Sequence, residues 1–380
     1  MGKKQNLLEE DDGKSYIKKS TLRKVKLCLE SILLKKRHKV LKTLIIRTDK
    51  LGDFYLTLPY IRSLQRNYGK ENIDIVISGD IYDHFKNKNY LFNKIFSFPK
   101  KNLINKILLI FKLRNFFYDQ VIIFDGKDRS IILSYLLKCA KKIFIIEKRK
   151  LNFLFRLILN KKNIFTVYDD RKENYSSLFS NLISSLNVKF SESDYKFLKY
   201  ENLYHLETKC PSINNLTPYT LLHLDEKWFS NLYINKFADM TPSYEDFLLF
   251  IKKFISSKNQ NLIITTGLKE ISFIHGLKMN FFTKINENFY EFNHINFKAI
   301  LLLNSSIKDL ETLSMNSNNI ITCNGPLTQI AQSLNINIID ILENDMEEWY
   351  DRHIYNKKKY HRLFRKKFND VYKEILFNLK

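Results

Sequence analysis

Short apolar runs, each followed by a polar turn and then by a segment with helical spacing, recur along most of the chain. The clearest unit spans Lys42–Gly69, with an apolar run at Leu44–Ile46, a polar loop at Thr48–Phe54 and helical spacing from Leu56 onward. A continuous apolar run is typical of a strand buried on both faces, and apolar positions three or four residues apart are typical of a helix. The pattern therefore predicts a strand, a loop and a helix, with Pro59 in the first helical turn.

Further units of the same kind follow. The expected strands are 72–78, 121–124, 143–146, 219–223, 262–266, 299–303, 319–322 and 336–341, and the expected helices are 131–137, 172–186, 243–255, 307–315 and 327–334. Strands that alternate with helices indicate an α/β protein, and the restart near residue 218 favours two domains. We expect a basic N-terminal segment or helix at 1–40, domains at 41–205 and 206–345, and a helical tail at 346–380.

Charge and cysteine content narrow the function classes. The 380 residues include 63 Lys and Arg against 40 Asp and Glu, a net charge of +23. This surplus implies attraction to a polyanion, namely nucleic acid, an anionic membrane or a phosphorylated substrate. The four cysteines form no CxxC motif, which favours a reducing compartment without a zinc cage or a disulfide framework.

Membrane targeting signals are absent from the sequence pattern. No apolar run approaches the roughly 18 residues that span a bilayer, and the first residues lack the apolar core of a signal peptide. We therefore expect a soluble or peripheral protein.

Two basic segments have alternative interpretations. Lys18–Lys39 surrounds an apolar stripe with cations, as in an ordinary surface helix or in a helix that rests on anionic lipid. His84–Tyr118 has no acid, eight Lys and Arg, and nine aromatic residues. It suits a solvated face, lipid headgroups or a phosphorylated glycolipid, and single-stranded nucleic acid would suit it too, although it contains no recognisable RNA-binding motif.

Candidate chemistry lies at the ends of the predicted strands. Open α/β sheets bind ligands at the carboxyl ends of their strands, where the first loop holds Asp53 beside the flexible Gly52. A helix-capping aspartate would explain the same residues. The loop after strand 121–124 carries Lys127 and Arg129, which could hold a phosphate or form salt bridges within the loop.

The second half of the chain offers a phosphate site. Asn324, Gly325 and Pro326 follow a predicted strand and open a helix, whose free N–H groups and positive dipole end favour a diphosphate. Lys227, in a neighbouring predicted loop, could neutralise phosphate charge.

The first loop resembles the signature of the lipopolysaccharide heptosyltransferases, glycosyltransferase family 9. That signature is Arg, three variable residues, Gly-Asp, and then Leu-Thr-x-Pro at the helix start. It is matched by Arg47, Leu51, Gly52, Asp53, Leu56, Thr57 and Pro59. The resemblance covers residues 42–345 and implies the GT-B fold, in which two Rossmann-like domains face each other across a cleft, here with a C-terminal helical tail.

The second half matches the family less fully. Family members carry Asp-Thr-Gly-x-x-His-x-Ala, or a variant with His-Gly-Ala, where this chain has Asn324 and Gln329 as the two polar anchors. Amides donate and accept hydrogen bonds but carry no charge and do not act as acid or base. Lys227 with Trp228 matches a Lys-Trp element of the family, and the next loop, where the nucleoside sits in the family, is matched by Thr265, Thr266, Gly267 and Glu270.

The resemblance implies an inverting, metal-independent glycosyltransferase that moves a heptose-like sugar from a nucleotide-diphosphate donor to a lipopolysaccharide core or another surface glycan. Asp53 is the candidate general base. The candidate donor-binding residues are Lys227, Thr265, Thr266, Gly267, Glu270, Asn324, Gly325, Pro326 and Gln329. The candidate acceptor-binding residues are Arg47, Lys50, Gly52, Lys127 and Arg129. No metal and no cofactor is expected beyond the ADP-heptose-like co-substrate.

The expected partners are the nucleotide sugar, a glycolipid or surface-glycan acceptor, and an anionic membrane. We expect the protein to be a cytoplasmic monomer that contacts the inner face of the inner membrane. Nucleic acid is not expected as a partner. Two other functions stay open: a non-catalytic relative that binds sugar nucleotides or glycans, which Asn324 and Gln329 would suit, and a nucleic-acid-binding protein, which only the charge favours.

Overall fold

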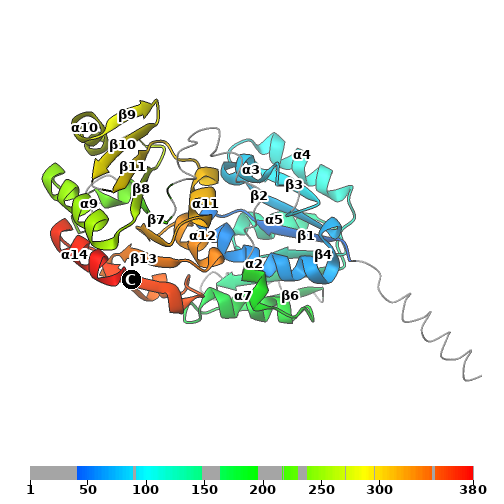
Figure 1. Ribbon diagram of the computed structural model, residues 1–380. Helices are drawn as coiled ribbons and strands as arrows, with labels where there is room; N and C mark the ends of the chain where they lie inside the picture. Colours follow the sequence, from blue (N-terminus) through cyan, green and yellow to red (C-terminus); the bar gives the residue numbers. More distant parts are fainter. Residues whose placement is uncertain are drawn as a thin grey trace, which may run out of the picture. The chain divides into compact units, whose positions relative to one another are not determined.

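The computed structural model describes residues 41–88, 91–147, 163–195, 216, 218–229, 238–269, 271–294, 296–344 and 347–379. The basic segment at 18–39 lies outside these ranges, as do most of residues 191–217, the polar stretch where we expect the linker between the two domains. Two β-sheets, which we call sheet A and sheet B, form within the compact unit Lys42–Lys380 (Figure 1).

Sheet A has six strands, all parallel. In spatial order they are β3 (Lys94–Phe98), β2 (Ile73–Ser78), β1 (Thr43–Arg47), β4 (Gln120–Ile123), β5 (Lys141–Glu147) and β6 (Ile164–Asp169). The order 3-2-1-4-5-6 is that of a doubly wound nucleotide-binding sheet. Every residue of β1 is buried because helices cover both faces of the sheet.

The helices of this half pack in two layers. One apolar cluster joins sheet A to α2 (Leu51–Tyr68), α3 (Gly79–Phe85) and α7 (Tyr175–Ser184). A second cluster joins the opposite face to α4 (Leu103–Arg114) and α5 (Asp128–Leu136). Alternate residues of β1 supply the two clusters, with Ile45 in the first and Leu44 and Ile46 in the second.

Sheet B has eight strands. In spatial order they are β14 (Tyr360–Phe364), β13 (Asn337–Leu342), β12 (Asn319–Thr322), β7 (Tyr219–Leu224), β8 (Asn261–Thr266), β11 (Phe297–Leu302), β10 (Phe289–His294) and β9 (Thr283–Asn286). The strands from β14 to β11 are parallel, and β10 runs antiparallel to both of its neighbours. The parallel part repeats the doubly wound order of sheet A.

The helices of sheet B also form two layers. α11 (Ile307–Met315) and α12 (Pro326–Leu334) cover one face, and α9 (Tyr244–Lys258), α10 (Ser272–Phe281) and α14 (Phe368–Asn378) cover the other. The remaining short elements are α13 (Glu347–Asp351) and the 3₁₀ turns η1 (Lys70–Asn72), η3 (Glu192–Tyr195), η5 (Glu226–Trp228) and η7 (Lys357–Lys359).

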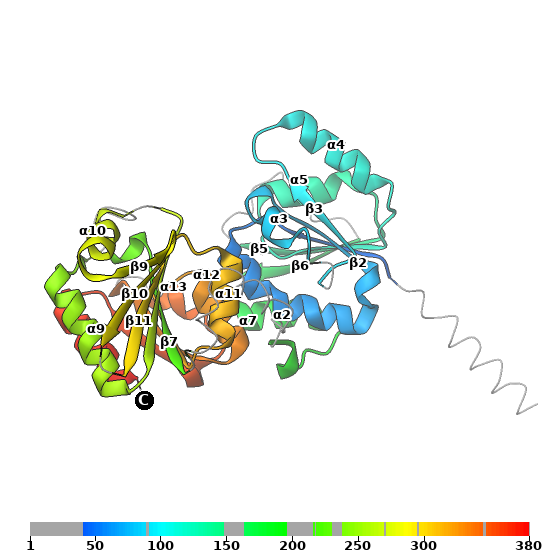
Figure 2. The ribbon, with the colours of Figure 1, turned by 45° about the horizontal axis from the view of Figure 1, so that its top comes forward.

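A single apolar cluster continues from sheet A into sheet B. It contains side chains of α2 and α7 from one half and of α11 and α12 from the other, and α2 contacts α12 directly. Figure 2 shows α11 and α12 next to α2, between the two sheets. The start of α2 and the start of α12, which both follow central strands, are therefore held near each other by core packing.

The structure corrects the first predicted loop. α2 begins at Leu51, so Gly52 and Asp53 are helical and the loop is shorter than the expected Thr48–Phe54. An acid in the first turn is favourable at the positive end of a helix, which explains the early start. Pro59 lies in the middle of α2 and not in its first turn; its burial offsets the backbone hydrogen bond that proline lacks.

The interior strands other than β10 were predicted, whereas β10 and the edge strands were missed. β3, β6, β14 and β9 are the four edge strands, and each of them exposes part of its side chains. An edge strand lacks the continuous apolar run on which the prediction depended. The tail expected to be helical does contain α13 and α14, but β14 lies between them as an additional strand. No helix in the described ranges combines the length and apolar content that crossing a bilayer requires.

Candidate active site

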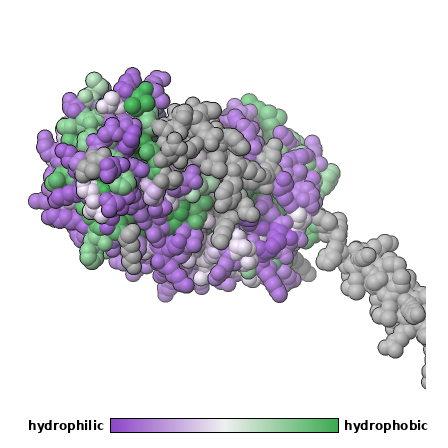
Figure 3. All heavy atoms as spheres, in the orientation of Figure 1, coloured by the Kyte–Doolittle hydropathy of each residue, from purple (hydrophilic) through white to green (hydrophobic). Residues whose placement is uncertain are grey.

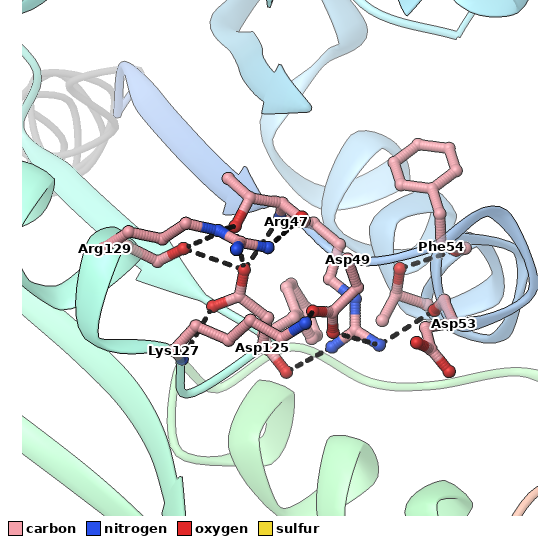
Figure 4. A network of polar contacts seen from close by, with 11 residues as sticks. Arg47, Asp49, Asp53, Phe54, Asp125, Lys127 and Arg129 are labelled. Carbon is pink, nitrogen blue, oxygen red and sulfur yellow. Dashed lines mark hydrogen bonds and ion pairs between the residues drawn. The ribbon is translucent and has the colours of Figure 1, made fainter. Parts of the chain in front are cut away.

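Arg47, the last residue of β1, fixes the backbone around the start of α2. Its guanidinium donates to the carbonyl of Phe124 (2.5 Å) and to the carbonyl of Asp53 (2.9 Å), and it lies 3.3 Å from the Asp49 carboxylate (Figure 4). The residue is 4% exposed, and its guanidinium lies over the Phe179 ring. Arg47 therefore acts first as a structural cation that positions Asp53.

Asp53 occupies the third position of α2 and is partly exposed. Figure 4 shows its side chain beyond the Arg47 contacts, with no dashed line to the carboxylate. Within the part of the chain that the structure describes, no hydrogen bond or ion pair engages this carboxylate. It is therefore available to a ligand, as a general base requires.

The neighbouring loop is anchored by Asp125. Its carboxylate accepts hydrogen bonds from the Thr48 amide (2.7 Å), the Thr48 hydroxyl (2.8 Å) and the Ser130 hydroxyl (2.8 Å). Burial raises the pKa of Asp125, and the nearby charge of Asp49 adds to this effect. These bonds hold the loops after β1 and β4 together, as expected for adjacent strands of one sheet.

Lys127 and Arg129 both have partners in these loops. Lys127 forms an ion pair with Asp49, and Arg129 donates to the Thr48 hydroxyl (2.7 Å) and the Thr48 carbonyl (2.5 Å). Internal pairing was one of the two interpretations of these cations, and their binding of an acceptor phosphate stays a prediction. Lys50, at the N-cap of α2, is exposed.

Lys227 lies beside the start of α12. Its ammonium donates to the carbonyls of Cys323 (3.1 Å) and Asn324 (2.5 Å) and lies 3.3 Å from the Asp225 carboxylate. A methyl group at Gly325 would lie 2.8 Å from the ammonium nitrogen, so glycine leaves the room that the lysine occupies. A positive charge and a helix N-terminus are thus adjacent, and both favour a phosphate.

Asp340 holds the turn at 324–326 in place through hydrogen bonds from the core. The carboxylate is fully buried and accepts hydrogen bonds from the Asn324 amide (2.7 Å), the Thr328 hydroxyl (3.3 Å) and the Tyr360 hydroxyl (3.1 Å). Burial raises its pKa to about 7. The sequence analysis did not select this residue, although a lone acid inside the apolar strand β13 was a visible signal.

The two predicted constellations meet at Gly52. A methyl group in place of its hydrogen would lie 3.6 Å from the Pro326 nitrogen and 3.8 Å from the Gly325 carbonyl carbon. Gly52 is helical, so the explanation for glycine here is this close approach of two helix starts and not a turn. Asp53 is the next residue, and it therefore lies near the turn that Lys227 contacts.

In the predicted nucleoside loop at 265–270, both threonine hydroxyls have contacts within the protein. Thr265 is fully buried, and its hydroxyl lies 3.0 Å from Nδ1 of His223, whose pKa burial lowers. The Thr266 hydroxyl accepts from the Asn304 amide (3.1 Å). A methyl group at Gly267 would lie within 3.9 Å of Asp225, which places this glycine beside the Lys227 loop. Glu270 lies outside the described residues.

Gln329 faces the C-terminal segment. Its amide donates to the carbonyl of His353 (3.2 Å) and accepts from the side chain of Gln332 (3.1 Å). The imidazole of His353 lies between Tyr175 and Trp349, with ring centroids 4.9 and 4.3 Å away, and Nδ1 lies 2.9 Å from the Trp349 carbonyl.

Burial lowers the pKa of His353, while its contact with the Trp349 carbonyl and the charge of Asp53 act in the opposite direction. His353 is therefore electrostatically coupled to the candidate base. The sequence analysis assigned it only to a helical tail, and the pattern there contained no signal for a site.

A cavity of about 830 Å³ lies elsewhere. Its lining includes Asn174 and Ser176 of α7, Gln332 and Asn335 of α12, and Tyr355. Neither Asp53 nor Lys227 lines it. In the described ranges no group of three or more His, Cys, Asp or Glu side chains is arranged to hold a metal ion.

The fold and the position of this site define a class of protein. Two doubly wound sheets, of which α2 from one and α12 from the other meet at the carboxyl ends of the strands, form the GT-B fold, so the expected fold class is confirmed. No protein-family model and no curated protein sequence matches the chain.

Three solved structures illustrate the similarity. A family 9 glycosyl transferase from Veillonella parvula DSM 2008 is 15% identical, with 90% of this chain and 92% of that chain covered and a TM-score of 0.61. E. coli heptosyltransferase WaaC with ADP-2-deoxy-2-fluoro heptose is 13% identical, with coverage of 89% and 99% and a TM-score of 0.59. E. coli ADP-heptose lipopolysaccharide heptosyltransferase II is 12% identical, with coverage of 89% and 95% and a TM-score of 0.58. The expected resemblance to glycosyltransferase family 9 is thus confirmed at the level of the fold.

Proposed function

We propose that this chain is a family 9 glycosyltransferase that transfers a heptose-like sugar, with inversion, from a nucleotide-diphosphate donor to a glycolipid or surface-glycan acceptor. One observation carries the proposal: the first turn of α2 lies against the Gly325–Pro326 turn, so that a carboxylate with no partner in the described ranges and a phosphate-type site lie close together. The fold supports the same class.

The donor diphosphate binds at the start of α12. Lys227 is already within 3.1 Å of two carbonyls of this turn, and phosphate oxygens would share its protons with them. The amides of the first helical turn supply further donors. The heptose-like donor with an adenine base is suggested by WaaC, whose solved structure contains ADP-2-deoxy-2-fluoro heptose.

Asp53 acts as general base. The acceptor hydroxyl attacks the anomeric carbon as its proton passes to the Asp53 carboxylate, and a new carbon–oxygen bond forms. The bond between the anomeric carbon and the diphosphate oxygen breaks, and the diphosphate leaves with the electron pair. Lys227 and the amides of α12 stabilise the charge on the leaving group. We propose no metal in this step, because a lysine and a helix start supply positive charge.

The acceptor lies on the sheet A side. The proposed contacts are made by Arg47, Lys50, Gly52, Lys127 and Arg129, of which Lys50 is exposed and the other cations have internal partners. A lipid-linked acceptor would place the enzyme at an anionic membrane surface, on its cytoplasmic side.

Donor binding provides the first test. In a thermal-shift screen of nucleotide sugars, a donor that binds only the native state raises the melting temperature. We expect Lys227→Met to weaken that donor by about tenfold to a hundredfold, since a hydrogen bond to a charged group contributes about 1.5–3 kcal/mol. Lys278→Met, on α10, is the control and should leave donor affinity unchanged.

Transfer provides the second test. Asp53→Asn should abolish sugar transfer and leave donor binding and folding nearly intact, whereas Asp128→Asn, an exposed acid in the first turn of α5, should remain active. Full activity of Asp53→Asn would remove this residue from the mechanism. Donor binding by the wild type without transfer to any acceptor would support a non-catalytic sugar-nucleotide-binding protein instead.

A further inference from the structure

The outer face of α4 has an unusual composition for a surface helix. Five large apolar residues point outward and are between 44% and 69% exposed: Leu103, Ile104, Ile107, Leu108 and Phe111. Their spacing places them on one side of the helix. Only Leu109 and Leu113 are buried against the sheet, so the more apolar side of α4 is the side that faces away from the core.

Cations surround this face. Lys101, Lys112 and Arg114 are exposed at the two ends of α4, and the ammonium groups of Lys106 and Lys112 lie over the rings of Phe98 and Phe96. The sequence contains no Asp or Glu between His84 and Tyr118. The face thus combines apolar side chains with positive charge, without the acids that would repel an anionic surface.

A neighbouring helix extends the apolar area. α5 packs in the same layer as α4, because the inner residues of both helices belong to one cluster on that face of sheet A. Ile132, Tyr135 and Leu136 of α5 are between 41% and 51% exposed. Figure 2 shows α4 and α5 side by side on one edge of the molecule, and Figure 3 shows hydrophobic surface over α4 next to hydrophilic surface.

We propose that the outer face of α4, extended by α5, is a docking surface for an anionic lipid bilayer. Large apolar side chains on a convex helix, with lysines and arginines around them, suit insertion between headgroups, where the apolar side chains leave water and the cations meet anionic lipid. The net charge of +23 adds attraction at longer range.

Docking in this way would connect the membrane to the site. α5 begins directly after the loop that contains Asp125, and Asp125 and Arg129, in the first turn of α5, both contact Thr48 in the loop that leads to Asp53. A bilayer against α4 and α5 would therefore present lipid-linked acceptors on the acceptor side of the enzyme. This consequence rests on the proposed function, whereas the docking surface itself does not.

The experiment is co-sedimentation of the full chain with vesicles of phosphatidylcholine, with and without phosphatidylglycerol, at low and high salt. We expect the wild type to bind the anionic vesicles at low salt and to dissociate at high salt. The triple variant Ile104→Ser, Leu108→Ser and Phe111→Ser should bind at least about tenfold more weakly, because the apolar contribution to partitioning is lost. The matched control replaces three exposed apolar residues elsewhere, Leu268→Ser, Met279→Ser and Phe377→Ser, and should bind like the wild type.

A second pair of variants tests the charge. Replacement of Lys101, Lys112 and Arg114 by Gln should weaken binding by about fivefold for each cation at low salt. Replacement of Lys252, Lys357 and Lys358 by Gln removes the same charge from exposed positions outside this face and should have a much smaller effect.

Three results would overturn the proposal. The first is that the wild type does not bind anionic vesicles at low salt. The second is that the α4 variants bind like the wild type, which would assign binding to another segment such as residues 1–40. The third is that, in sedimentation velocity without vesicles, the wild type is an oligomer and the α4 variant a monomer, which would assign the face to a protein interface. Donor binding of the α4 variant, measured by thermal shift, should be unchanged, so failure of docking and failure of the proposed function are distinguishable.

Discussion

A buried ion pair joins the two sheets, and its removal should be strongly destabilising. Lys88, which follows α3, lies 2.7 and 2.8 Å from the two carboxylate oxygens of Glu311 on α11. The Tyr55 hydroxyl of α2 donates to the same carboxylate, and His84 lies 3.3 Å from it. The side chain of Glu311 is fully buried and that of Lys88 is 9% exposed. We call these four residues the Glu311 cluster.

The pKa of Glu311 sets the magnitude. Burial alone would raise this pKa, but the hydrogen bonds and charges of His84 and Lys88 outweigh burial and lower it from 4.5 to about 2. For the carboxyl group alone, a shift of this size corresponds to about 3 kcal/mol of stability, and the burial of Lys88, which lowers the pKa of its ammonium, offsets part of this. Because the folded pKa is depressed, this contribution is present above about pH 4.5 and is lost as the pH falls through about 2. Lys88→Met leaves a buried carboxylate without its cation, so we expect a loss of about 3–5 kcal/mol at neutral pH.

Urea denaturation at several pH values is the appropriate assay. The Lys88→Met midpoint should fall at pH 7, and its decline between pH 4.5 and 2 should be shallower than that of the wild type, because less charge stabilisation remains to be lost. The double variant Lys88→Met with Glu311→Gln should recover much of the loss, since no unpaired charge is buried. Lys86→Met is the control, because the Lys86–Asp83 pair is exposed and its removal should not move the midpoint. A Lys88→Met protein as stable as the wild type at pH 7 would refute the reasoning.

Three further predictions follow from the contacts of the site. Gly52→Ala should fold and remain active, because its methyl group fits 3.6 Å from the Pro326 nitrogen. Gly52→Val should lose activity, and overpacking should lower its stability in urea denaturation by about 1–3 kcal/mol. Equal activity of the two variants would contradict the close approach of the two helix starts. In Asp53→Asn, the pKa of His353 should fall, because a carboxylate that favours the imidazolium is removed. Histidine NMR titration measures this pKa, and an unchanged value would mean that the two side chains do not interact. The pKa of Asp340 is raised, so the free energy of unfolding of the wild type should fall by up to about 4 kcal/mol as the pH rises from about 4 through 7. Asp340→Asn should remove this pH dependence in urea denaturation. The same pH dependence in both proteins would exclude Asp340 as its source.

The strand pattern could be predicted where a strand is buried on both faces. β1, β2, β12 and β13 are buried on both faces, so their sequences are apolar runs that stand out from the loops. Edge strands such as β3 and β14 are partly exposed and carry Lys, His or Arg, so that no single-sequence pattern separates them from loops or helix ends. A short-range signal also agreed: the helix expected at 243–255 is α9, and Ser243 caps it by accepting from the Asp246 amide.

The site was partly predictable, because strand order places loops at a common sheet edge. The positions of Asp53 in the first turn after β1 and of Asn324 just after β12 follow from the alternation of strands and helices. The pairing of Lys88 with Glu311 joins residues 223 positions apart, and Gln329 contacts the His353 carbonyl from another element. The first contact depends on how the two halves pack and the second on the path of the C-terminal segment, and local periodicity contains no information about either.

The packing between α2 and α12 also explains why the acid and the phosphate site can work together. Both helix starts belong to elements that share one apolar cluster, so their separation is set by close-packed side chains and not by flexible loops. Transfer of a sugar requires the base, the acceptor oxygen and the anomeric carbon to be aligned closely, and misplacement by about 1 Å can reduce the rate about a hundredfold. The Glu311 cluster adds a polar contact to the same junction, since Tyr55 follows Asp53 by two residues. Residues far from the donor and acceptor, such as Lys88, should therefore affect catalysis through the position of Asp53 as well as through stability.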